Sequence, residues 1–211
     1  MQDIGLHWNL KKCSVVHVKR GAQVLDESGM RMDETTTITA LGELKHYKFM
    51  GVLENVRQNE RLALACAAKE YLRRISIIWS SPLSDCNRVQ ETNQYALPVL
   101  RYLMWTQHWT ILELWDVDRA ARKIIVENGG KHPASPTSLL YLPKEKWGRG
   151  LRSLEHEYKL TKIKSLLKLY QNSAQTVEAV REFEEHAMAS GHQSLVKEAA
   201  KYAEELNINF S

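Results

Sequence analysis

The apolar residues of this 211-residue chain change their spacing once, at residues 46–54. Before that stretch, short β-branched and threonine-rich runs alternate over a few residues, which is the period of a strand. After it, apolar residues recur every three or four positions over long windows, which is the period of a helix. The sequence therefore predicts an α+β chain in three parts: a small β region (1–54), a mainly helical middle (55–172) and a C-terminal helical hairpin (173–211).

The β region is predicted from short segments that precede this change. A β-branched run carries Val16 and Val18 on one face, and two runs rich in methionine or threonine follow it. We therefore expect small strands at residues 13–18, 29–32 and 35–39.

Residues 46–54 themselves predict a further strand. Tyr47 and Phe49 fall on one side and Lys48 on the other, so neither side is purely polar, as in a strand that is covered on both faces. Gly51 in such a strand indicates a bulge or the close approach of another backbone. An ordinary packed strand before a helix is the simpler alternative.

Helices are predicted along the rest of the chain. Pro98 is expected to bend or divide the second of them, and a proline- and glycine-rich loop is expected at 131–150. The second helix is expected to be heavily buried through Tyr95, Val99, Tyr102, Met104 and Trp105. The predicted helical ranges are 57–79, 84–108, 111–128 and 153–170, followed by two shorter acidic helices separated by Gly191.

The charge is unevenly distributed. Lys and Arg number seven against seven Asp and Glu in residues 1–54, nineteen against eleven in 55–172, and three against seven in 173–211. A basic middle favours an anionic partner such as nucleic acid, although a solvated helical surface gives a similar pattern.

The sequence lacks the motifs that are typical of several kinds of chemistry. Three cysteines form no CxxC pair, so no closed zinc site is indicated. Asp116 and Asp118 point to different sides of a helix, where we expect them to serve the helix dipole and face solvent and not to bind a metal. Glycine-rich nucleotide motifs and a hydrolase nucleophile elbow are absent. No run approaches the roughly eighteen apolar residues that a membrane span needs, so we expect no membrane partner and an intracellular location, with the nucleus as one option.

Basic residues on one ridge of the first long helix suggest a surface that follows a phosphate backbone. Arg61, Lys69 and Arg73 lie on this ridge, and nearby aromatic residues such as Trp147 or Tyr158 could stack on bases. A solvated amphipathic helix remains open as the alternative.

Three motifs occur in order along the chain. They are Gly5-Leu6-x-x-Asn9-x-x-Lys12-Cys13, then Tyr47-Lys48-Phe49-Met50-Gly51-Val52-Leu53-Glu54, and then Leu140-Tyr141-Leu142-Pro143-Lys144 with Gly148-Arg149-Gly150-Leu151. In this order they resemble the end of reverse transcriptases of non-LTR (LINE-type) retroelements. The first two resemble the last two motifs of the polymerase palm, and the third resembles a landmark of the helical thumb.

This resemblance implies a fold and a set of roles. It implies a small antiparallel β remnant of a palm followed by a mainly helical thumb that holds template–primer nucleic acid by its phosphates. Lys12 would correspond to the palm lysine that assists proton transfer to pyrophosphate. The implied nucleic-acid-binding residues are Tyr47, Lys48, Phe49 and Gly51 of the primer grip and Arg61, Lys69, Arg73, Arg119, Arg122, Lys123 and Arg149 of the thumb.

The sequence also departs from the family. Relatives often carry Leu at the position of Met50 and two glycines at the positions of Trp147 and Gly148. The metal-binding aspartates of the palm lie upstream of the matching motifs, so this chain is expected to hold no Mg²⁺ and to lack polymerase activity by itself. The implied partners are RNA–DNA or duplex nucleic acid and the missing palm half or another protein. The alternative is a helical protein-interaction module without a nucleic-acid role.

Overall fold

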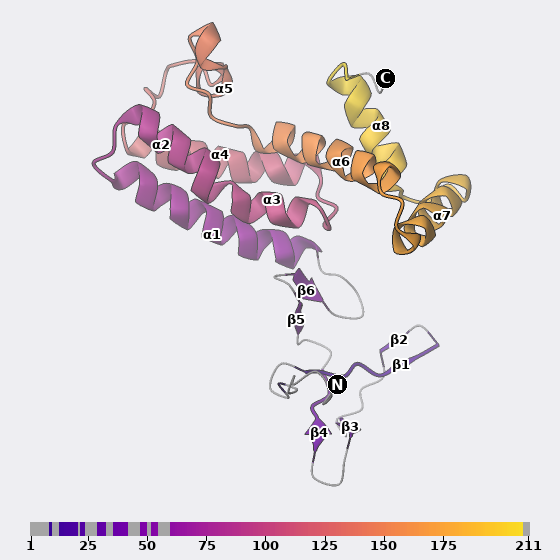
Figure 1. The fold of residues 1–211 in the computed structure, drawn as a ribbon. Helices are drawn as coiled ribbons and strands as arrows, with labels where there is room; N and C mark the ends of the chain where they lie inside the picture. Colours follow the sequence, from indigo (N-terminus) through magenta and orange to yellow (C-terminus); the bar gives the residue numbers. More distant parts are fainter. Residues whose placement is uncertain are drawn as a thin grey trace. The chain divides into compact units, whose positions relative to one another are not determined.

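The computed structural model describes residues 9, 13–20, 22–23, 29–32, 36–41, 47–49, 52–54 and 60–208. The chain divides into two compact units, Met1–Ala63 and Leu64–Ser211. The first unit contains the described strands and the second contains the helical bundle, in agreement with the α+β prediction (Figure 1).

The strands among the described residues form three two-stranded antiparallel ladders. They are β1 (Val18–Lys19) with β2 (Ala22–Gln23), β3 (Met30–Arg31) with β4 (Thr37–Ile38), and β5 (Tyr47–Phe49) with β6 (Val52–Glu54). The strands expected at 29–32 and 35–39 are confirmed as the β3–β4 pair. The strand expected at 13–18 is mostly wrong, because Val15 makes only an isolated bridge with Ala40 and regular pairing begins at Val18.

Residues 47–54 form a hairpin and not the single strand that the alternation predicted. Tyr47 pairs with Glu54 and Phe49 pairs with Val52, so the chain reverses between the two halves. A two-residue connection ending in glycine is typical of tight hairpins, because their turns need positive φ angles. Met50 and Gly51 form this connection in the sequence and lie outside the described residues.

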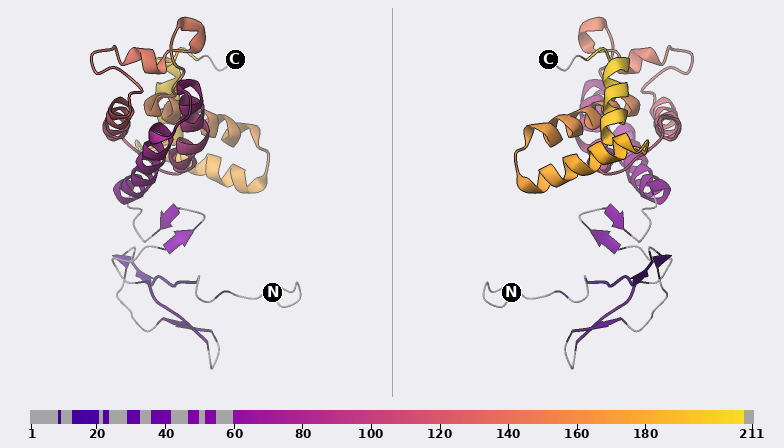
Figure 2. Two further views of the ribbon diagram at one scale, coloured as in Figure 1. Left: turned by 90° about the vertical axis from the view of Figure 1, so that its left-hand side faces the viewer. Right: turned by 90° about the vertical axis from the view of Figure 1, so that its right-hand side faces the viewer.

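The helical part of the chain is described without a break from residue 60 to residue 208. Its elements are α1 (Glu60–Ser80), α2 (Asp85–Glu91), the π-helical turn η3 (Thr92–Ala96), α3 (Pro98–Met104), α4 (Ile111–Glu127), α5 (Ser138–Tyr141), the 3₁₀ turn η4 (Lys144–Lys146), α6 (Leu154–Gln171), α7 (Gln175–Ala189) and α8 (Leu195–Glu205). In the second unit, α3, α4 and α8 all pack on α6 (Figures 1 and 2).

The end of α1 is fixed in the core by Trp79. This side chain is fully buried, and its Nε1 donates to Thr92 Oγ1 at 3.0 Å. A Cβ on Gly130 would lie 2.0 Å from the Trp79 ring, so the loop after α4 can cover the indole only with a glycine there. The three- and four-residue spacing of this helix predicts an apolar stripe of Leu64, Ala67, Ala68, Tyr71, Leu72, Ile75, Ile78 and Trp79. All of these residues are buried except Leu72, which is half-buried.

Pro98 divides the second predicted helix, as expected, and the division changes which side chains are buried. Proline has no amide hydrogen, and the turn before it widens so that Leu97 N donates to Thr92 O at 2.9 Å. The burial expected for Tyr95 and Tyr102 is wrong, since they are 49% and 54% exposed. Met104 is buried as expected, and Val99 and Trp105 are half-buried. The rest of the core of this segment is formed by Val89, Ala96, Leu97, Leu100 and Leu103.

Helix α6 is covered by neighbours on more than one face. It contacts α3 and α4 and also α8, so the polar side chains of Thr161 and Lys162 are buried along with Tyr158. Burial makes the stacking of Tyr158 on a base, suggested by the sequence, incompatible with this fold. Toward the end of α6, Leu167 and Tyr170 are exposed.

The acidic hairpin of α7 and α8 is confirmed around Gly191, whose φ of +77° suits glycine. Its two helices differ in burial. Ala199, Tyr202 and Ala203 of α8 are buried, whereas α7 has no buried residue among those described. Among the described residues, no helix combines the length and apolar composition needed to cross a membrane.

Candidate nucleic-acid interface

A basic groove lies where α3 meets α6. Its first hollow has a volume of about 520 Å³. One side of α6 carries His156 and, eight positions later, Lys164. Arg152, four positions before His156, continues this basic side just ahead of the helix. Arg101 of α3 and Trp105, the residue that follows α3, are also four positions apart and line the groove with them.

Glu157 holds the two arginines of the groove. Arg101 Nη2 lies 2.7 Å from Glu157 Oε2, and Arg152 Nη1 lies 3.4 Å from Oε1. The close Arg101 contact lacks hydrogen-bond geometry, and the buried Nε and Nη2 atoms of Arg101 have no hydrogen-bond acceptor in the described part of the chain. With Lys164 included, the lining carries three permanent positive charges against one negative charge, so the groove is suited to an anion.

A second hollow, of about 340 Å³, continues the groove toward the 142–151 loop. It shares Arg101 and Arg152 with the first and adds Lys144 and Gly150 from the loop. Asn93 of the π-helical turn joins the two sides, because its Nδ2 donates to Gly150 O at 2.9 Å and its Oδ1 accepts from Arg152 N at 3.0 Å. The π-helical turn therefore positions both the loop and the first basic residue before α6.

The 142–151 loop is closely braced by its own backbone. Gly148 N donates to Pro143 O, Gly150 N to Leu142 O, and Leu151 N to Leu140 O. A Cβ on Gly148 would lie 1.9 Å from Leu142 O, so this fold of the loop requires glycine there. Trp147 precedes it with φ of +60° and is 94% exposed.

The apolar run before this loop is tied to α4 by Asp118. Tyr141 Oη donates to Asp118 Oδ2 at 2.6 Å, and Arg122 Nη1 donates to both groups. Burial raises the pKa of Asp118, although the bonds from Tyr141 and Arg122 offset part of this effect. Asp118 is thus a buried anchor for the Leu140–Lys144 motif, and the expectation that it faces solvent is wrong.

Most of the basic residues expected to bind nucleic acid form ion pairs with carboxylates of this chain. The pairs are Arg73 with Glu70, Arg119 with Asp116, Arg122 with Asp118, Lys123 with Glu127 and Arg149 with Asp85. Hydrogen bonds from Arg73 and Arg74 lower the pKa of Glu70 to about 2. Arg61 and Lys69 are exposed on α1. The structure thus distributes these residues among separate ion pairs, and the groove between α3 and α6 is lined by other cations.

The residues implied for the palm belong to the first unit. Tyr47 is half-buried in β5, and only the backbone of Lys48 and Phe49 is described. Lys12 and Gly51 lie outside the described residues. Their implied roles therefore remain predictions.

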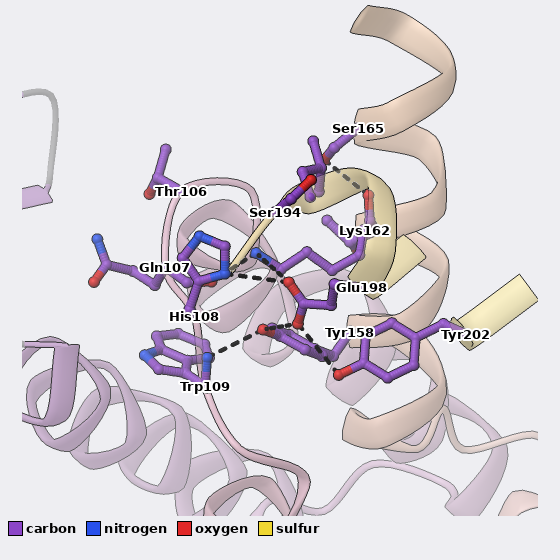
Figure 3. Close-up of polar contacts among 12 residues, drawn as sticks. Thr106, Gln107, His108, Trp109, Tyr158, Lys162, Ser165, Ser194, Glu198 and Tyr202 are labelled. Carbon is purple, nitrogen blue, oxygen red and sulfur yellow. Dashed lines mark hydrogen bonds and ion pairs between the residues drawn. The ribbon is translucent and has the colours of Figure 1, made fainter. Parts of the chain in front are cut away.

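A second polar cluster fixes α8 to the bundle (Figure 3). Glu198 Oε1 accepts from Tyr158 Oη at 3.0 Å and from Tyr202 Oη at 3.2 Å, while Oε2 lies 3.1 Å from His108 Nδ1. Lys162 Nζ lies 3.8 Å from Oε2 and donates to Gln107 O at 2.8 Å. Each of these atoms is engaged inside the fold, so the cluster is a structural link between helices.

The basic residues predicted for the thumb lie on α1, on α4 and at Arg149, so the prediction does not include the groove. Arg101, Trp105 and Lys164 were not selected, although the spacing Arg152, His156, Lys164 and Lys168 is a readable signal of one basic side. Across the described residues, no group of three or more His, Cys, Asp or Glu side chains is placed to hold a metal ion. Comparisons of the chain with protein-family models, curated proteins and solved structures gave no match.

Proposed function

We propose that the helical unit binds the sugar–phosphate backbone of nucleic acid in the groove between α3 and α6. The observation that carries this proposal is the convergence of Arg101, Arg152 and Lys164 on a hollow of about 520 Å³ that contains a single carboxylate, Glu157. Guanidinium and ammonium groups along a groove neutralise successive phosphates without reading sequence. Trp105, with Lys168 Nζ 4.5 Å from its ring centroid, forms one wall.

The resemblance of the three motifs extends this proposal to a family. The chain would be a piece of a retroelement RNA-directed DNA polymerase that keeps the primer grip and thumb but lacks the catalytic aspartates. Its partner would be an RNA–DNA hybrid or another duplex, and it would not extend a primer by itself. Primer extension by the purified chain on a primed RNA template would contradict this part of the proposal.

Salt dependence of binding tests the groove directly. The variant Arg152→Gln/Lys164→Gln removes two groove charges, and Lys197→Gln/Lys201→Gln removes two exposed charges from α8 as a matched control. Binding of a fluorescent RNA–DNA hybrid is measured by anisotropy between about 50 and 200 mM salt. We expect the groove variant to reduce the slope of log K against log salt by up to about 1.8, because each lost phosphate contact contributes about 0.9.

The control variant is expected to change this slope much less. An equal reduction of the salt slope in both variants would show that the groove is not the binding site. A flat salt plot for the unmodified chain would refute phosphate binding altogether.

A helical interaction module is the second candidate, and one observation favours it. Helix α7 exposes Val180, Phe183 and Met188, with Phe183 72% exposed. Apolar side chains gathered on an unburied helix are typical of surfaces that contact another protein. Size-exclusion chromatography of the chain, with and without Phe183→Ser, measures whether this face drives self-association.

A further inference from the structure

Trp147 is presented to solvent by a loop that fixes its position. The side chain is 94% exposed, and the residue adopts φ of +60° and ψ of +19°, a left-handed conformation that favours glycine. A large apolar side chain in a strained and exposed position contributes nothing to the core. An outlier of this kind points to a role in binding.

The backbone around Trp147 is held on both sides. Trp147 N donates to Lys144 O at 3.0 Å, and Gly148 N donates to Pro143 O at 3.0 Å. The loop is also attached to α2, because Arg149 Nη1 lies 3.0 Å from Asp85 Oδ1 and Lys144 Nζ donates to Cys86 Sγ at 3.1 Å. The indole is therefore carried on a braced support, which lowers the entropy lost when it binds a partner.

The location of this loop indicates which kind of partner Trp147 would contact. Lys144 and Gly150, on either side of Trp147, line the second hollow of the basic groove. Lys146 and Arg149 add positive charge next to the indole in the sequence. A backbone that leaves the groove at this end reaches a loop that carries an exposed aromatic ring and basic residues close to it in the chain, and aromatic and basic residues together are used to stack single-stranded bases.

We propose that Trp147 stacks on an unpaired base of the nucleic acid whose phosphates occupy the groove. This inference rests on the proposed function and adds a preference for an unpaired end over a blunt duplex. An indole stacks on any base, so we expect the chain to prefer an overhang with bases over one without bases and to show no preference for a particular sequence. A base–aromatic stack corresponds to an affinity difference of about fivefold to a hundredfold.

The test compares two probes that carry the same number of phosphates. One is an RNA–DNA hybrid with a short single-stranded overhang, and the other has abasic sites throughout the overhang. The unmodified chain is expected to prefer the first probe by at least about fivefold, and Trp147→Ala is expected to abolish this preference. Trp147→Gly removes the indole and also relieves the backbone strain, so this variant should unfold at no lower a temperature than the unmodified chain. If it also loses the preference for the first probe, the loss cannot be due to unfolding. Trp115→Phe, at a half-exposed tryptophan of α4, is the matched control.

Each outcome separates this inference from the proposal that it extends. Equal affinity of the unmodified chain for the two probes, or an intact preference in Trp147→Ala, overturns the stacking role while the groove proposal stands on its salt slope. An equal loss of affinity of Trp147→Ala for heparin, a polyanion without bases, also overturns stacking. A chain that binds neither probe at low salt refutes both proposals.

Discussion

The carboxylate of Glu198 accepts a hydrogen bond of 3.0 Å from the hydroxyl of Tyr158, and this contact joins α8 to α6. The same hydroxyl accepts from Trp109 N at 3.0 Å, at the start of the segment that leads into α4. Three parts of the chain that are distant in sequence therefore meet at one phenol.

Glu198→Gln is expected to destabilise the helical unit by about 2–3 kcal/mol, because it weakens charge-assisted bonds in a mostly buried site. Burial opposes ionisation of Glu198, but the bonds from His108 and Tyr158 and the charge of Lys162 outweigh it and hold its pKa below the usual 4.5. The folded state thus favours the ionised form. Its stabilising contribution is present above pH 4.5 and is lost as the pH falls through the lowered value.

Urea unfolding at several pH values measures this effect. The difference between the unmodified chain and Glu198→Gln should shrink as the solution is acidified below pH 4.5. Glu204→Gln removes the same charge from an exposed position of α8 and serves as the control. A difference that stays constant with pH would contradict the proposed linkage.

Tyr141→Phe is expected to lower the free energy of unfolding by about 1.5–3 kcal/mol. The change removes a 2.6 Å bond to Asp118 and leaves that buried carboxylate with Arg122 as its partner. Tyr95→Phe is the control, because the half-exposed Tyr95 keeps the ring on which the Arg74 guanidinium lies at 4.3 Å. Equal unfolding free energies for the two variants would show that the bond to Asp118 contributes little.

Gly148→Ala is expected to disrupt the loop that carries Trp147. A Cβ at residue 148 would meet Leu142 O, whereas a Cβ at Gly129 would meet nothing within 4 Å. Gly129→Ala, with φ of +72°, should therefore cost only about 1 kcal/mol of backbone strain. Thermal unfolding should show the larger loss for Gly148→Ala, and the opposite order would contradict the close contact.

Phe183→Ser is expected to change stability by no more than about 0.5 kcal/mol, since the ring is exposed. Ile75→Ala, at a fully buried position of α1, should cost about 2–5 kcal/mol by the same measurement. A large loss in Phe183→Ser would show that α7 belongs to the core in solution. Its apolar face would then no longer favour an interaction module.

The existence and type of the helices followed from spacing. The stripe from Leu64 to Trp79 needs only local periodicity, because a long helix with one apolar side buries that side in most folds. Pro98 likewise marked the break, since the missing amide hydrogen acts wherever the residue lies. The buried faces near the break could not be predicted. A π-helical turn rotates the residues on its two sides, and Tyr95 and Tyr102 lie in solvent as a result.

By itself, the sequence determined the change from short strands to helices, the basic middle of the chain and the hairpin around Gly191. These are local properties of residue type and spacing. Tertiary structure alone decided which charges are neutralised across different helices and loops and which gather in a groove. Arg149 is held by Asp85, whereas Arg101 and Arg152 share Glu157 beside Lys164. Electrostatic partners are set by distances across packed helices, and the order of residues along the chain does not contain those distances.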